Sequence, residues 1–429
     1  MSLCAHLLDA PDLKLLGHYL SHTSRTIAFD RDDLYVLHVG IPNLAISSKA
    51  LMSSMLALAA ASQCHDLLEA SPGSPDVVRI RELLVLGEQH HAASLRQIQE
   101  DIPSTERYDH VLANAALMFL YGSASHWVRI RLMRVCCVES GGGGNRLPEE
   151  FVPAQNPAVA VLGDSERTSL RQIEFGDVNV VCPQNGPSDE TRRLFLPILA
   201  ATSGAALTKL RARARQVEME AANGSEGLGV CMEALAVFQA VLGETFSDRR
   251  PGGLSPETPG SQTDDPRGPL HPPSLGRLSN VAPWLRRYTA RVTMNSTDSR
   301  PLRRTVNAFI NRVSTKYLHM VQATLEHIPV EAAGRGATRS QGYTLEDQDA
   351  DSGPVQRLAM DIFAHWLVLV LLLDGVWWIG GIGAWELGRV VAYARERGWI
   401  DMGDKADDEA WWPQSMYNIK IELSRNLAS

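Results

Sequence analysis

The feature that most constrains this fold is an apolar run near the C-terminus, Phe363 to Trp385, with the sequence FAHWLVLVLLLDGVWWIGGIGAW. The run has nearly the length of a membrane-spanning helix, which needs about 20 apolar residues. His365 and Asp374 interrupt it, however, and glycines at 380, 381 and 383 break its second half. We therefore expect a buried core helix followed by a tight glycine turn, in a chain with no membrane span.

Apolar residues elsewhere recur at three- and four-residue steps, the period of an amphipathic helix. Beyond residue 100 this pattern predicts helices over 105–135, 189–222, 226–245, 302–328, 355–373, 384–397 and 410–426. Alternation typical of strands is scarce, and 173–181 is the one stretch that we consider for a strand. The predicted fold class is all-α.

Three segments rich in glycine, proline and polar residues interrupt the helical pattern, near 140–163, 248–276 and 331–353. Such composition is typical of flexible or disordered loops. None of the three clearly separates two cores, so we expect one helical domain over residues 1–429 with long disordered loops. The N-terminus lacks the basic and apolar regions of a signal peptide. The sparse cysteines are typical of reduced thiols, so we expect a protein of the nucleus or the cytoplasm.

The charge balance argues against a nucleic-acid-binding surface. The formal net charge is −8, whereas such a surface normally shows an excess of Lys and Arg. Basic residues do cluster at Arg129, Arg131 and Arg134 and at Lys209, Arg211, Arg213 and Arg215. Because apolar residues separate the members of each cluster, we expect solvated helix faces or ion pairs rather than contacts with nucleic acid.

No cofactor or metal site is predicted from local spacing. The six cysteines, at 4, 64, 136, 137, 182 and 231, include no C-x-x-C pair, so we expect reduced thiols and no zinc cluster. His90 and His91 point about 100° apart on a helix and cannot share one metal. The glycine turn lacks the spacing of a phosphate-binding loop, and no Gly-x-Ser-x-Gly nucleophile motif occurs.

Three pairs of sequence blocks carry a family resemblance. The first pair is LGHYLSHTSRT at 16–26 and IPNLAISSKALMSSMLALAAASQ at 41–63; the second is GEQHHAASLRQIQ at 87–99 and YDHVLANAALMFLYG at 108–122. The third is AHWLVLVLLLDGVWWIGGIGAWELGRVV at 364–391 and WWPQSMYNIKIELSR at 411–425. In this order the blocks resemble the regulatory, ligand-binding domain of fungal zinc-cluster transcription regulators, in the sterol-uptake-control branch.

The resemblance implies a helical domain that senses an apolar metabolite and controls transcription. It also implies a homodimer, or a heterodimer with full-length relatives, and a C-terminal pocket for a sterol, terpenoid or polyketide of secondary metabolism. The zinc cluster that precedes this domain in the family is missing, so DNA recognition is not carried over. Gly381 stands where family members often show an acidic residue, which leaves no polar contact to expect from that position.

The C-terminal block supplies the candidate ligand-binding residues. Large aromatic rings beside small glycines can line a cavity for a rigid apolar molecule, with a few polar groups that fix its orientation. The candidates are His365, Trp366, Asp374, Trp377, Trp378, Gly380, Gly383 and Trp385. The alternative is a tryptophan-rich core in which Asp374 caps a helix and Glu386 pairs with Arg389.

Two other functions remain open. A free-standing enzyme on this scaffold could fold a terpenoid or polyketide for cyclisation, isomerisation or dehydration, with His365, Asp374 or Glu386 as acid or base. The third hypothesis is a scaffold protein that dimerises with full-length relatives and acts as a dominant-negative partner. The binding module without catalysis is the favoured one.

Overall fold

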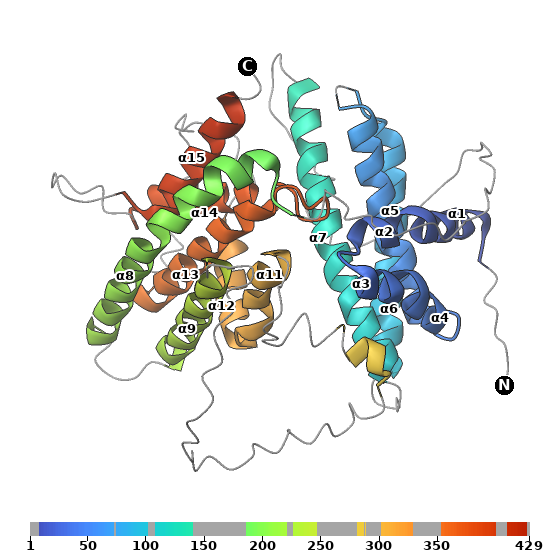
Figure 1. Cartoon of the computed structure of the whole chain (residues 1–429), viewed down its shortest axis with the longest axis horizontal. Helices are drawn as coiled ribbons and strands as arrows, with labels where there is room; N and C mark the ends of the chain where they lie inside the picture. The colour runs from blue at the N-terminus through green and yellow to red at the C-terminus, as the bar shows by residue number, and fades with distance from the viewer. Residues whose placement is uncertain are drawn as a thin grey trace, which may run out of the picture. The chain divides into compact units, whose positions relative to one another are not determined.

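The structure is a computed structural model that describes residues 8–72, 74–101, 108–139, 186–220, 226–246, 281–286, 288, 302–328, 353–399 and 410–426. Every regular element in these ranges is helical and none is a strand, so the fold is all-α as predicted (Figure 1). The segment considered for a strand, 173–181, lies outside the described residues. So do the predicted loops, apart from Gly353.

Contacts divide the chain into two compact units. The first falls within Met1–Pro183 and Asn280–Leu285, and the second within Gln184–Ser279 and Arg286–Ser429. The assignment of one regulatory domain to residues 1–429 stays a prediction.

In the first unit, three long helices carry the core: α5 (Lys49–Ala70), α6 (Val77–Asp101) and α7 (Tyr108–Glu139). Helix α5 packs against both of the others, and its alanines let the backbones approach closely; a Cβ on Gly87 of α6 would lie 3.3 Å from that of Ala60. Short helices precede them: α1 (Ala10–His18), η1 (Tyr19–Thr23), α2 (Ser24–Ile27), α3 (Arg31–Tyr35), η2 (Val36–Gly40) and α4 (Ile41–Ala45).

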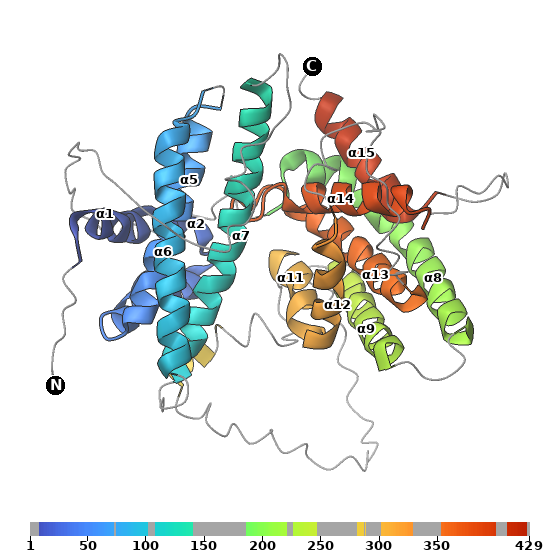
Figure 2. The same ribbon diagram turned by 180° about the vertical axis from the view of Figure 1, so that it is seen from behind.

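The second unit is built around α13 (Pro354–Val370), which continues as the single turn η9 (Leu371–Leu373). Before it come η6 (Thr191–Phe195), α8 (Leu196–Glu220), α9 (Glu226–Phe246), α11 (Leu302–Arg312) and α12 (Thr315–Leu325). After it come α14 (Ile382–Glu396) and α15 (Trp412–Asn426). Helix α13 contacts α8, α9, α11, α12, α14 and α15 (Figure 2), and these neighbours bury every residue from Ile362 to Val370.

One predicted helix boundary is wrong. Residues 302–328 were expected to form one helix, but α11 ends at Arg312 and α12 begins at Thr315. Ser314 has extended backbone angles, and its hydroxyl accepts a hydrogen bond from the backbone N–H of Tyr317 at 3.3 Å. This N-cap starts a new helix and so breaks the periodic pattern.

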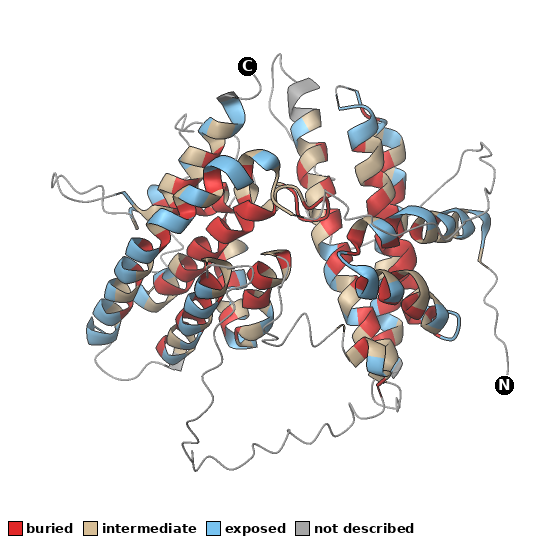
Figure 3. Ribbon diagram, in the orientation of Figure 1, coloured by how far each residue is buried: buried red, intermediate tan, exposed pale blue. Residues whose placement is uncertain are grey.

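Two helices in the described ranges are long and apolar enough to cross a membrane: Gly227–Phe246 and Pro354–Leu373. This is weak evidence for a span, because core helices pass the same test. Of the apolar window in Pro354–Leu373, 78% is buried inside the protein, as Figure 3 shows for α13. That burial agrees with the predicted core helix.

Candidate functional site

Helix α13 positions the first group of candidate residues. Gly353 and Pro354 begin it, and proline is well tolerated at a first helical position because its missing N–H needs no partner there. Every residue from Ile362 to Val370 is buried. A polar side chain between Ile362 and Val370 therefore lies inside the second unit, where its polar atoms need hydrogen-bond partners within the protein.

Asp361 gathers several donors from other elements. Arg213 of α8 donates from Nε to Oδ2 at 2.6 Å, and Trp411 donates from Nε1 to Oδ1 at 2.8 Å. His365 lies one turn further along, with Nδ1 3.1 Å from Oδ1. Burial favours a higher pKa for Asp361, but the interactions with His365 and Arg213 outweigh it and hold the pKa well below its ordinary value. The carboxylate is therefore ionised.

His365 is almost completely buried, with 1% of its surface exposed. Its Nδ1 donates to the backbone carbonyl of Asp361 at 2.8 Å. Its ring stacks on Trp412 of α15, with centroids 5.4 Å apart, and meets Phe238 of α9 edge-on at 6.1 Å. Its second nitrogen, Nε2, is buried and has no hydrogen-bond partner among the residues that the structure describes.

Trp366 faces a different neighbour. Its ring stacks on Phe309 of α11 at 5.4 Å, and its Nε1 donates to the carbonyl of Val306 at 2.9 Å. Phe363 packs beside it, with ring centroids 5.5 Å apart. These contacts fix α13 against α11, so Trp366 is a core residue with its polar group satisfied.

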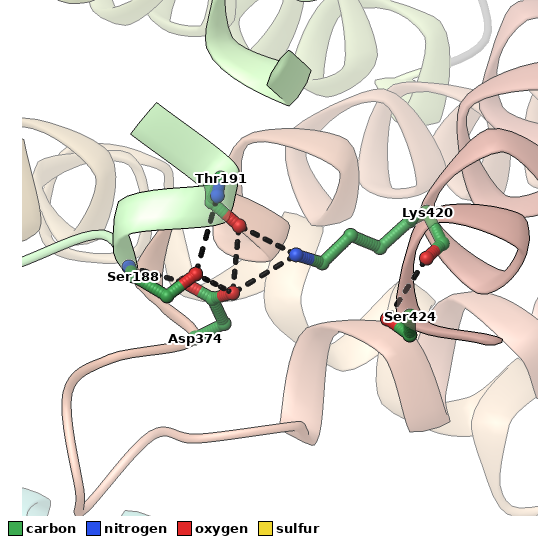
Figure 4. Close-up of polar contacts among 5 residues, drawn as sticks. All are labelled: Ser188, Thr191, Asp374, Lys420 and Ser424. Carbon is green, nitrogen blue, oxygen red and sulfur yellow. Dashed lines mark hydrogen bonds and ion pairs between the residues drawn. The ribbon is translucent and has the colours of Figure 1, made fainter. Parts of the chain in front are cut away.

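Asp374 anchors a polar cluster that joins three elements (Figure 4). Its carboxylate accepts from the N–H and hydroxyl of Ser188 at 2.9 and 2.7 Å and from the hydroxyl of Thr191 at 2.6 Å. Lys420 of α15 donates from Nζ to Asp374 Oδ2 at 2.9 Å and also to Thr191 Oγ1. Ser424 donates to the carbonyl of Lys420, one turn back on the same helix.

The cluster is charged but internally satisfied. Lys420 has only 8% of its side chain exposed, and its ammonium also lies 5.6 Å from the centre of the Phe195 ring. Burial raises the pKa of Asp374, yet the hydrogen bonds from Ser188, Thr191 and Lys420 together outweigh it, so the pKa lies below its usual value. Asp374 thus binds η6 and α15 to the end of α13.

The glycine turn after Asp374 is closely packed. Gly380 has a φ of 48°, a left-handed conformation that favours glycine, and its N–H donates to the carbonyl of Val376. A Cβ on Gly383 would lie 3.0 Å from backbone atoms of Val370 and Leu371, so the start of α14 lies directly against the end of α13. Trp377 and Trp378 are buried in this turn, while Trp385 is half-buried.

Glu386 forms an ion pair within α14. Its Oε2 accepts from Arg389 Nη1 at 2.8 Å, and the same guanidinium donates to the carbonyls of Leu325, the last residue of α12, and of Ile328 just beyond it. The pair satisfies carbonyls that a helix C-terminus leaves without intrahelical donors.

The structure does not bring His365, Asp374 and Glu386 into one group. His365 and Asp374 are nine positions apart along a continuous helical segment, which corresponds to about 13 Å. Their partners also differ, because Asp374 contacts η6 and α15 while Glu386 pairs with Arg389 on α14. Each of the three lies in its own network.

Several residues of these networks were not singled out from the sequence. Asp361 could have been found, since it precedes His365 by one helical turn. The partners of Asp374 could not, because Ser188 and Thr191 lie 186 and 183 residues away in the chain. The remaining unpredicted residues are Phe238, Phe309, Trp411, Trp412 and Lys420.

The other candidates lie in ion pairs or aromatic contacts. Arg129 pairs with Glu88, Arg131 with Glu69 and Arg213 with Asp361. His90 lies 3.0 Å from Asp12, and His91 packs on Tyr121. No three His, Cys, Asp or Glu side chains are placed to hold a metal ion within the described ranges. The side chains of Cys136 and Cys137 fall outside them.

No protein-family model, curated protein or solved structure matches this chain.

Proposed function

We propose that this chain is a regulatory module of the sterol-uptake-control type that binds an apolar small molecule in its second unit. The candidate ligands are sterols, terpenoids and polyketides. The sequence blocks that resemble this family support the proposal, and the last two blocks include α13, α14 and α15.

One observation carries the proposal. His365 Nε2 is buried beside aromatic rings and has no hydrogen-bond partner in the described part of the chain. Leaving a buried polar atom unsatisfied costs about 1–3 kcal/mol, so each case calls for an explanation such as a water, an ion or a ligand. An apolar ligand with one polar group would satisfy Nε2 and keep the surrounding rings out of water.

The carboxylates favour binding over catalysis. Asp374 is paired with Lys420, and Glu386 with Arg389, so neither offers a free base to a bound molecule. A general acid or base must reach the reacting atom by a hydrogen bond or through one water. This leaves His365 as the polar contact among the three candidates.

Binding can be tested by titrating the purified full chain with dehydroergosterol delivered from cyclodextrin, with energy transfer from tryptophan as the signal. We expect saturable binding with one ligand per chain, and a weaker signal in His365→Phe. Native mass spectrometry of the untreated protein would show co-purified lipid and any dimer. If sterol, terpenoid and polyketide probes all fail to saturate, the proposal is wrong.

The regulatory role itself rests on the family resemblance, as do localisation and dimerisation. A sterol sensor of this kind would redistribute between cytoplasm and nucleus with sterol supply. A fluorescent fusion followed during sterol depletion measures this, and a distribution that does not respond contradicts the regulatory role.

An enzyme remains the second candidate, because Asp361 holds the ring of His365 as an aspartate orients a catalytic histidine. In that case His365 would act as general base in an isomerisation or cyclisation. Incubation with terpenoid and polyketide precursors, followed by mass spectrometry, separates the two. Turnover lost in His365→Phe would establish the enzyme, while binding without turnover supports the regulator.

A further inference from the structure

Residues 281–285 belong to the first unit, although the chain on both sides of them belongs to the second. The second unit takes Gln184–Ser279 before this segment and Arg286–Ser429 after it. A helical turn begins at Pro283. These residues, the docked segment, therefore reach the first unit from a distant part of the sequence.

Three apolar side chains anchor the docked segment. Val281 is 2% exposed, Leu285 is completely buried, and Trp284 is half-buried, whereas Pro283 is exposed. The three anchors are spaced i, i+3 and i+4, which is the spacing at which a helical peptide binds in a groove. The segment thus has the pattern of a docked helical peptide.

Gly40, at the end of η2, makes room for the indole ring of Trp284. A Cβ on Gly40 would lie 2.8 Å from two carbons of that ring. The backbone of Gly40 has a φ of −64° and a ψ of −54°, helical angles that any residue adopts, and glycine costs a helix about 1 kcal/mol relative to alanine. The close approach of the ring, rather than the backbone, is therefore what requires glycine here.

Two further side chains complete the contact. Tyr35 of α3 meets the Trp284 ring edge-on, with centroids 6.3 Å apart, and is itself 51% exposed. Asp109 of α7 accepts a hydrogen bond at Oδ1 from the backbone N–H of Ala282 at 2.7 Å, across 173 positions of sequence. The first N–H groups of a helix have no acceptor within the helix, so this carboxylate satisfies one of them. Tyr35, Gly40 and Asp109 are called the Gly40 site below.

The docked segment is too short to be a stable helix alone. An isolated turn of helix is unfavourable in water, so part of its binding free energy is lost in ordering it. Its attachment to the rest of the chain offsets this loss, because a tethered segment acts at a high effective concentration. A contact of this kind can open without unfolding the helices around it.

We infer that the Gly40 site is a docking site for a short helical peptide, and that the docked segment is its own reversible occupant. The peptide that fits has an apolar residue, a tryptophan and a leucine at the spacing of Val281, Trp284 and Leu285. A partner with these three anchors binds by displacing the segment. The inference is independent of the ligand proposed for the second unit.

A labelled peptide with the sequence of residues 279–288, SNVAPWLRRY, tests the site by fluorescence anisotropy. With an effective concentration of about 1 mM for the tethered segment and a peptide Kd of about 100 μM for the vacant site, wild type should bind the peptide about tenfold more weakly than Trp284→Ala does. A peptide with alanine in place of tryptophan should bind neither chain. Equal binding to wild type and Trp284→Ala, or binding to neither, overturns the inference.

Gly40→Ala in the Trp284→Ala chain tests the space for the indole ring. The new Cβ would meet the ring of the bound peptide, so we expect binding at least about tenfold weaker, as for the loss of a well-packed interface anchor. Gly17→Ala in the same background is the matched control, because a Cβ on Gly17 of α1 meets no atom within 4 Å and should leave binding unchanged. Equal effects of the two substitutions contradict the assignment of the site.

Hydrogen exchange of the full chain follows the docked segment itself. Residues 281–285 should lose protection in Gly40→Ala and in Trp284→Ala, the second of which leaves the site unaltered, while α5 in Trp284→Ala keeps its protection. Protection at 281–285 that persists in both variants overturns the inference. Protection that falls on dilution of the wild type would assign the occupant to a second copy of the chain, and would overturn the assignment to the chain's own segment.

Discussion

Replacing Asp374 by asparagine should destabilise the second unit more than removing its partner Lys420. In Asp374→Asn the ammonium of Lys420 stays buried, with Thr191 and the Phe195 ring as its remaining contacts. In Lys420→Met the carboxylate keeps the N–H and hydroxyl of Ser188 and the hydroxyl of Thr191. The two variants therefore lose different amounts of stabilisation although they break the same pair.

The magnitudes follow from burial. Breaking a buried pair by removing one charge costs about 3–5 kcal/mol, and the 23% exposure of the Asp374 side chain places Asp374→Asn near the lower end. Lys420→Met leaves the Asp374 carboxylate without its ion-pair partner, but three hydrogen-bond donors and 23% exposure still stabilise the negative charge, so we expect about 1–2 kcal/mol. Adding Lys420→Met to Asp374→Asn should recover about 1 kcal/mol or more, because it removes the stranded ammonium.

Hydrogen exchange is the suitable assay, because a chain with two units need not unfold in one step. Peptides from 191–195 and 412–426 should lose protection, while α5 in the first unit gives an internal reference. Arg425→Met is the control on the same helix: Arg425 pairs with Glu422 on the surface, where such pairs contribute little. Lys420→Met costing more than Asp374→Asn, or no recovery in the double variant, would refute the reasoning.

The same cluster should give an acid-dependent difference. The pKa of Asp374 is depressed in the native state, mainly by hydrogen bonds that overcome its burial. Its contribution is therefore present above the ordinary aspartate pKa of about 3.9 and is lost as the pH falls through the native value. Wild type and Asp374→Asn should accordingly begin to converge in protection as the pH falls below about 3.9, and the gap should narrow steadily as the pH approaches the lower native value; a gap that stays constant on acidification contradicts the assignment.

Three further predictions concern other residues. Gly375→Ala should destabilise the second unit by about 1–3 kcal/mol, because the new Cβ would lie 2.4 Å from the carbonyl oxygen of Gly186. Gly229→Ala is the control: its Cβ would meet open space, so the same exchange assay should show no loss of protection or a small gain. Burial lowers the pKa of His18 to about 4, so between about pH 6.5 and pH 4 the unfolded chain binds a proton that the native chain does not. The free energy of unfolding of the first unit should therefore fall by up to about 3 kcal/mol over this range. In chemical denaturation His18→Phe should remove this pH dependence. Burial raises the pKa of the Cys64 thiol to about 12, so iodoacetamide should modify Cys64 at the rate of unfolding, as followed by peptide mass spectrometry.

Local patterns in the sequence predicted the long helices, apart from the break at Ser314, and one ion pair within a helix. The apolar run up to Leu373 predicted a buried helix, and its burial on all sides is what a central position requires. The spacing of Glu386 and Arg389 predicted their ion pair, because residues three apart share a helix face. The break at Ser314 was missed because apolar periodicity continues across it, while the capping hydroxyl is a single-residue signal.

Contacts between distant segments could not be predicted from one sequence. Nothing near Asp374 indicates that Ser188 and Thr191, more than 180 residues earlier, supply its donors. The sequence predicted that Asp374 would cap a helix or contact a ligand. In the structure its carboxylate joins η6 and α15 to the end of η9, a role that depends on packing at long range, and a contact with a ligand stays a prediction.

His365 and Asp374 were equivalent in the sequence, since both are polar residues in one apolar run, and the structure distinguishes them by their hydrogen bonds. Asp374 has donors for both of its oxygens, so a ligand at that position would have to break an ion pair before it gained a contact. His365 has acceptors for Nδ1 and no hydrogen-bond partner for Nε2 among the described residues, so a ligand there would gain a contact and break none. A buried polar atom without a partner costs free energy in the unliganded protein, so a ligand that forms this hydrogen bond gains that amount in its free energy of binding. The polar residue with the incomplete set of partners is therefore the better candidate for recognition.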